Sequence, residues 1–151
     1  MEKTQRRTSL LGLAAAATFA ATGLIASTQS AQAATPPVVS GVAVAPASIA
    51  LGGSAQVTAR ATNTTSGTLD VSMGIDIPAN AHPLHATGTN GCTPRLLTRI
   101  TYCGVRLAPG GSATLTITST PSATGGYVFT SYGRIAYTGT NDTNTVTLTV
   151  S

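Results

Sequence analysis

Over much of this sequence, small apolar residues alternate with polar residues, and many of the polar ones are threonine. The alternation runs through residues 55–62, 69–77, 113–118 and 145–150. A period of two places one side of an extended chain in a core and the other in water. Threonine is β-branched and fits a half-exposed strand position. The pattern therefore predicts half-buried β-strands over these four ranges.

Three more strands are predicted, and turn residues separate all of them. Gly52-Gly53 and Pro109-Gly110-Gly111 mark turns, as do the Asn and Asp residues of 138–142. No helical periodicity follows residue 33. The sequence predicts an all-β fold, an immunoglobulin-like antiparallel β-sandwich of about seven strands over residues 34–151. The additional strands are expected at residues 38–45, 96–105 and 127–137.

The composition suits a folded domain with a thin core. The 151 residues are 42% apolar but only 4% aromatic and 8% charged. Alanine and valine bury little area each, so a covalent link would add useful stability. After residue 33 the charged residues are five arginines and three aspartates. The arginines are scattered, without the basic stripe that nucleic acid requires, so no nucleic-acid partner is expected.

Residues 1–33 have the three regions of a cleavable export signal. A positively charged start is followed by an apolar run over 10–26 and a polar stretch that ends in small residues. This arrangement predicts a signal peptide cut between Ala33 and Ala34. The run is short, rich in alanine and interrupted by threonine, which disfavours a membrane anchor.

The first residues are compatible with either of two export routes. Arg6-Arg7 resembles a twin-arginine signal, and an ordinary basic start on the general secretory route fits as well. No cysteine lies near the cleavage site, and residues 34–151 show no apolar tail. We expect the exported domain to be secreted, extracellular or loosely associated with the cell wall. No membrane contact is expected after signal cleavage.

Cys92 and Cys103 are the two cysteines of the sequence. Their spacing matches no zinc-binding pattern and no redox motif of the C-x-x-C type. An exported protein meets an oxidising compartment, where paired cysteines form disulfides. One disulfide that closes a short loop is therefore predicted.

Several blocks of the exported region resemble a known family. It is the immunoglobulin-like repeat called domain of unknown function eleven, found in bacterial and archaeal surface proteins. The resemblance implies a surface module without catalysis or cofactor. The blocks that carry it are residues 57–67 with Asn63 and Gly67, Asp76-Ile77-Pro78-Ala79, the two cysteines, residues 107–113 and residues 141–150.

A search for catalytic or metal-binding groups finds few candidates. His82 and His85 form H-x-x-H in a predicted loop, which lacks the helical spacing of zinc hydrolases. Asp142 has the oxygen ligands of a calcium site, but a hairpin turn explains it better. No nucleophile elbow, phosphate loop or dinucleotide motif occurs. We expect no enzyme activity, no cofactor and no metal.

A binding role remains, with an unknown protein or a cell-envelope component as partner. Tyr132 and Arg134 are expected on one outward face of their strand, opposite the core aromatics Tyr127, Phe129 and Tyr137. The leading hypothesis is a secreted, non-catalytic module that binds or builds at the bacterial cell envelope. The alternative is a small secreted inhibitor or effector of a foreign enzyme. It would act through the disulfide-closed loop with Arg95, Arg99 and Arg106.

Overall fold

The computed structural model describes residues 35–138 and 141–151. The predicted signal peptide, residues 1–33, and the predicted cut between Ala33 and Ala34 lie outside the described residues. The described part of the chain contains strands and loops and no helix. In chain order the strands are β1 (Val38–Ala45), β2 (Ser48–Ile49), β3 (Ala55–Asn63), β4 (Leu69–Asp76), β5 (Ala81–Gly88), β6 (Arg95–Leu96), β7 (Ile100–Leu107), β8 (Ser112–Pro121), β9 (Gly125–Ile135) and β10 (Asn141–Val150).

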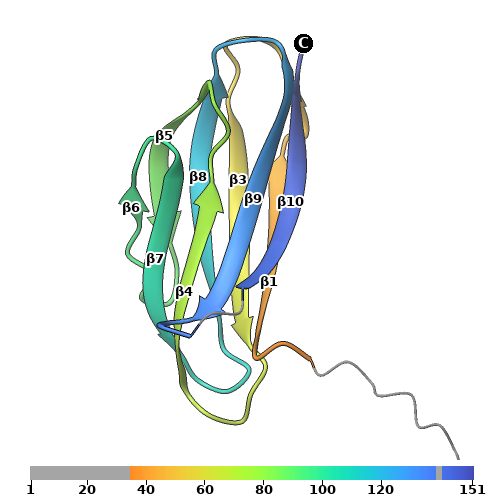
Figure 1. The fold of residues 1–151 in the computed structure, drawn as a ribbon. Helices are drawn as coiled ribbons and strands as arrows, with labels where there is room; N and C mark the ends of the chain where they lie inside the picture. Colours follow the sequence, from red (N-terminus) through yellow and green to blue (C-terminus); the bar gives the residue numbers. More distant parts are fainter. Residues whose placement is uncertain (1–34, 139–140) are drawn as a thin grey trace, which may run out of the picture. The chain divides into compact units, whose positions relative to one another are not determined.

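These strands form two sheets that pack face to face, as Figure 1 shows. One sheet has the order β1-β3-β8-β5, and the other has the order β2-β10-β9-β4-β7-β6. Among the described residues, only the short pairing of β2 with β10 is parallel. The predicted all-β immunoglobulin-like sandwich is confirmed. Each predicted strand region contains a strand, and β2 and β5 are additional.

The alternation of the sequence is the alternation of burial. In β8, Ala113, Leu115 and Ile117 are fully buried, while the threonines between them stay partly exposed. Phe129 of β9 and Met73 of β4 fill the space between the sheets and are 0% exposed. Full burial of such a large apolar side chain contributes about 1.5–3 kcal/mol, so this inner layer holds the sheets together.

Strand β5 corrects one expectation. His82 and His85 were predicted in a loop, but both lie in β5, which pairs with β8 at the edge of its sheet. The register shifts between Pro83 and His85. Proline donates no ladder hydrogen bond, so it is tolerated only at such an edge. Because most of β5 is exposed, its sequence does not alternate regularly. The strand predicted over 96–105 is likewise divided into β6 and β7.

The connection between β9 and β10 also differs from the prediction. Tyr137 was expected on the core face of a longer strand, but it lies beyond β9 with φ 68° and is fully exposed. Asp142 was expected in a turn, but it lies in β10. Its carboxylate accepts a hydrogen bond from the backbone amide of Ser40. Asn144 donates to the carbonyl of Ser40 at 2.9 Å. These bonds tie edge strand β1 to the opposite sheet and override the turn preference.

The predicted disulfide is confirmed between Cys92 and Cys103, with a Cα–Cα distance of 5.4 Å. Both residues are buried, and the bond ties the segment after β5 to the inner side of β7. Gly88 is required beside it. A Cβ at Gly88 would lie 2.1 Å from the carbonyl oxygen of Cys92. The turn that brings Gly88 and Cys92 together is closed by a hydrogen bond from the amide of Cys92 to the carbonyl of Thr89 at 3.0 Å.

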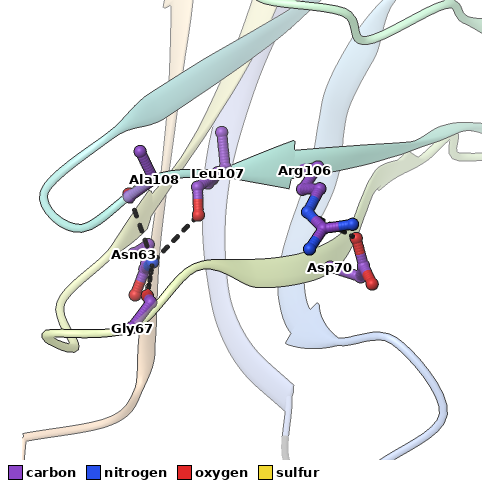
Figure 2. A network of polar contacts seen from close by, with 6 residues as sticks. All are labelled: Asn63, Gly67, Asp70, Arg106, Leu107 and Ala108. Atoms are coloured by element: carbon purple, nitrogen blue, oxygen red, sulfur yellow. Dashed lines mark hydrogen bonds and ion pairs between the residues drawn. The ribbon is translucent and has the colours of Figure 1, made fainter.

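A buried amide joins two turns at one end of the sandwich. Asn63, the last residue of β3, is 0% exposed. Its Nδ2 donates to the carbonyls of Gly67, Leu107 and Ala108 at 2.7, 3.1 and 3.2 Å, which Figure 2 shows. Its Oδ1 accepts from the amide and the hydroxyl of Thr65. One side chain thus satisfies the β3–β4 turn and the end of β7 together.

Tyr127 makes a second contact that fixes a turn. It lies near the start of β9, is 6% exposed, and its hydroxyl donates to the carbonyl of Ala123 at 2.8 Å. Immunoglobulin-like sandwiches use such a tyrosine corner to close the connection between their sheets. The ring packs in the core, so the residue serves packing and not surface recognition.

Candidate binding face on the six-stranded sheet

The outer side of the six-stranded sheet carries a row of residues in register. Gly74 of β4 pairs with Tyr102 of β7 on one side and with Tyr132 of β9 on the other. Arg95 of β6 continues the row beside Tyr102. Successive side chains point to opposite faces, and the neighbours of Gly74 in β4 are core residues. The row therefore faces away from the core.

Tyr132 lies across the glycine of this row. A Cβ at Gly74 would be 2.5 Å from the Cζ and hydroxyl oxygen of Tyr132, so only glycine leaves room for the ring. Burial of the ring, assisted by the charge of Asp76, raises the pKa of Tyr132, while the positive charge of Arg134 opposes the shift. The guanidinium carbon of Arg134 is 5.8 Å from the ring centroid, within the range of a cation–π contact.

A hollow of about 720 Å³ opens beside this row. Its lining includes Tyr102, Gly104 and Arg106 of β7, Ser72 of β4 and Arg134 of β9. A Cβ at Gly104 would meet no atom within 4 Å, so at this point the floor is bare backbone. The volume lies within the range of small-molecule sites, about 300–1,000 Å³. We call Tyr102, Gly104, Arg106, Tyr132 and Arg134 the tyrosine–arginine face.

One arginine of this face has an acidic neighbour. Arg106 Nε lies 4.0 Å from the Oδ1 of Asp70, and Figure 2 shows the two side chains on the adjacent strands β7 and β4. Both side chains are well exposed, at 76% and 68%. Exposed pairs of this kind contribute about 0–1 kcal/mol, so Asp70 holds Arg106 only weakly in position.

The structure brings most of the predicted surface residues together. Tyr132, Arg134 and Arg106 belong to the tyrosine–arginine face, and Arg95 lies next to Tyr102 in register. Arg99 is apart from them, in the turn between β6 and β7. The loop proposed for an inhibitor is thus a hairpin of β6 and β7, and its inhibitory role stays a prediction.

Sequence reasoning found Arg106 of β7 but missed the neighbouring residues of β4 and β7. Tyr102, Gly74 and Gly104 were not singled out, although both strands place glycine at outward positions. A glycine at an outward strand position signals a close approach of another group. The two glycines are visible in the sequence, but the register between β4 and β7, which places them on one face, is not.

The two histidines do not form a site with the aspartates. His82 and His85 are exposed on β5 in the four-stranded sheet, whereas Asp70 and Asp76 belong to β4 in the other sheet. Within residues 35–138 and 141–151, no three side chains of His, Cys, Asp or Glu are grouped as a metal ion requires.

The fold defines an immunoglobulin-like β-sandwich with a hollow on the outer side of one sheet. Comparison with solved structures gives a similar result. The CARDB domain of a Pyrococcus furiosus protein, solved in complex with di-metal ions, matches with a TM-score of 0.55 and 16% identity over 77% of this chain and 89% of that one. BslA, a bacterial hydrophobin, matches with a TM-score of 0.52 and 14% identity over 76% and 95%. At these identities the likeness concerns the fold alone.

Comparisons of sequence add no family. No family model matches the chain, and no curated protein matches it either. The resemblance to the surface repeat therefore stays a prediction. Within the described ranges, no helix has the length and hydrophobicity that crossing a bilayer requires. A buried disulfide and an immunoglobulin-like fold are both typical of proteins outside the cytoplasm.

Proposed function

We propose that this chain is an exported, non-catalytic binding module of the bacterial cell envelope. Its ligand is a carboxylate-bearing polysaccharide, bound on the tyrosine–arginine face. The observation that carries the proposal is the hollow whose bare floor at Gly104 lies among Tyr102, Arg106 and Arg134. The resemblance to a surface repeat and the predicted export signal support the location.

The shape of the hollow suits a sugar ring. Gly104 presents flat backbone, so a ring can approach it without meeting a side chain. Tyr102 is half-buried on the adjacent row and offers an aromatic surface with a polar hydroxyl at its edge. Aromatic side chains combine apolar area with a polar group in this way at many binding surfaces.

The charges suit a carboxylate. Two arginines, Arg106 and Arg134, and one aspartate, Asp70, line the hollow, so its net charge is positive. The planar guanidinium group holds a carboxylate through two parallel hydrogen bonds. Arginine keeps its proton at physiological pH, so these groups hold an anion and do not transfer protons. This chemistry supports binding over catalysis.

The export of the domain has separate support. Cys92 and Cys103 are joined, and such a bond persists in an oxidising compartment. Residues 34–151 carry five arginines and three aspartates, so the exported domain is mildly basic and attracted to an acidic polymer.

The experiment measures binding of the exported chain, purified from culture, to polygalacturonate and to neutral dextran by calorimetry. We expect binding to polygalacturonate that weakens with salt, and none to dextran. Gly104→Gln should weaken binding about tenfold or more, because its side chain fills the space that the ligand would occupy. Arg134→Gln should weaken binding by a similar factor, because it removes about 1.5 kcal/mol or more of charged hydrogen bonding.

Gly41→Gln is the matched control. Gly41 lies in β1 of the other sheet, and a Cβ there also meets nothing within 4 Å. This variant should bind as the unchanged protein does. Equal affinity for both polysaccharides, or equal effects of the Gly104 and Gly41 substitutions, would refute the proposal.

A further inference from the structure

Four exposed leucines gather away from the tyrosine–arginine face. Leu51, Leu84, Leu96 and Leu97 are 53%, 62%, 39% and 52% exposed. Two shallow hollows join them: one is lined by Leu96 and Leu97, the other by Leu51 and Leu84, and both include His82. We call the four leucines the leucine patch. Exposed apolar side chains that gather in one region mark an interaction site more often than scattered ones do.

The patch is assembled from three separate segments. Leu51 lies in the turn before β3, Leu84 in β5, and Leu96 and Leu97 at the end of β6 and just after it. None of these segments is a long apolar run, which is why the sequence led us to expect no membrane contact. That expectation covered any membrane contact after signal cleavage, and a surface that the fold builds from three segments is a reason to revise it.

The edge strand beneath the patch is unsuited to pairing with another strand. Pro83 removes a backbone donor from β5, and the register shift next to it places Leu84 out of the regular ladder. Both features block strand addition at a sheet edge. The partner must therefore meet side chains and not backbone.

The charges around the patch identify the partner. Arg95 and Arg99 flank Leu96 and Leu97 in the chain and are exposed. No carboxylate lines either of the two hollows. In a two-fold dimer this patch would meet the same patch of a second copy, which offers the arginines no carboxylate in either hollow. A partner that combines an apolar layer with negative charge at its surface fits both the leucines and the arginines.

We propose that the leucine patch docks onto an anionic lipid surface. The leucines enter the boundary between headgroups and acyl chains, and the arginine side chains reach back to the phosphates. This binding is peripheral. It uses other residues than polysaccharide binding does, and either proposal can fail without the other.

The test is co-sedimentation of the exported chain with vesicles. Vesicles of equal parts phosphatidylglycerol and phosphatidylcholine are compared with vesicles of phosphatidylcholine alone. We expect clear binding to the first and weak binding to the second. Arg99→Gln should lower binding to the anionic vesicles about fivefold, since one arginine near such a surface contributes about that factor.

The leucines are tested together. Leu84→Ser with Leu97→Ser should lower vesicle binding at least about tenfold, because each leucine buries roughly half its side chain on docking. Val128→Ser is the matched control, since Val128 is 52% exposed on β9 and lies outside the patch. It should change binding less than about twofold.

Three results would overturn the proposal. The first is absence of binding to anionic vesicles, and the second is an equal loss for the leucine variant and Val128→Ser. The third is dimer formation in equilibrium sedimentation that the leucine substitutions abolish, which would assign the patch to a second copy. Circular dichroism of each variant confirms that the sandwich is intact. Unchanged polygalacturonate binding by the leucine variant separates this result from the proposed function.

Discussion

Asn63→Asp isolates the role of the buried amide, because it changes one NH₂ group to oxygen at almost constant volume. The two N–H groups of Asn63 serve three carbonyls, at 2.7, 3.1 and 3.2 Å. Their loss removes about 2 kcal/mol of net hydrogen bonding, and a buried oxygen facing carbonyls adds about 1–3 kcal/mol. We expect a total loss of about 3–5 kcal/mol near neutral pH, a large part of a small domain's stability.

The same variant should depend on pH with a definite sign. Burial against three carbonyls raises the pKa of the new carboxyl above its unfolded value of about 3.9. The folded state then holds the proton more tightly than the unfolded state. The variant therefore comes nearest to the unchanged protein below about pH 4, and its deficit grows as pH rises to the folded-state pKa.

Urea unfolding at a series of pH values, followed by circular dichroism, measures this deficit. Asn80→Asp is the control with the same change of charge. Asn80 is exposed in a turn with φ 62°, a conformation that Asn and Asp both tolerate. Its unfolding free energy should change by less than about 0.5 kcal/mol. Equal losses in the two variants, or a pH-independent loss for Asn63→Asp, would refute the reasoning.

Three further changes test other parts of the structure. Tyr127→Phe removes the hydrogen bond to the β8–β9 connection and should lower the unfolding free energy by about 1 kcal/mol in urea titrations, and no loss would contradict the corner contact. Replacing Cys92 and Cys103 together with alanine should remove about 3 kcal/mol, and a reductant should then no longer affect stability. Burial raises the pKa of Tyr132, so its contribution is present below about pH 10 and is lost as pH rises through the folded-state pKa. The stability of the unchanged protein should therefore fall more steeply above about pH 10 than that of Tyr132→Phe, and parallel curves would argue against a buried ring.

The strands of the core were predictable because burial alternates along each of them. Leu115 and Ile117 are separated by a threonine that faces outward, and this spacing is visible in the sequence. Strand β5 was not predictable from alternation, because an exposed edge imposes no such pattern and Pro83 argues against a strand. The prediction of a turn at Asp142 was wrong for a different reason. Its hydrogen-bond partner, the amide of Ser40, is about a hundred residues away in the chain.

Arg106 of β7 was expected at the surface, but the grouping of site residues was predictable only within β9. Tyr132 and Arg134 are two residues apart, so a period of two places them together. Tyr102 and Gly104 come from another strand, and their place opposite β4 depends on register. Register is set by turns and by packing that local pattern does not reveal. The bare backbone at Gly104 was also not predicted because glycine has no side chain that would suggest a binding role.

The ends of both sheets have a shared consequence for how copies of the domain can associate. The six-stranded sheet finishes at each side in a strand of only two residues, β2 and β6. In the four-stranded sheet, the amide of Ser40 on edge strand β1 already donates a hydrogen bond to Asp142 of the other sheet. Pro83 interrupts the other edge strand, β5. Each of these features interrupts the backbone that a neighbouring copy could extend. These interruptions disfavour the growth of fibrils, and they leave the associations of the domain largely to its side chains.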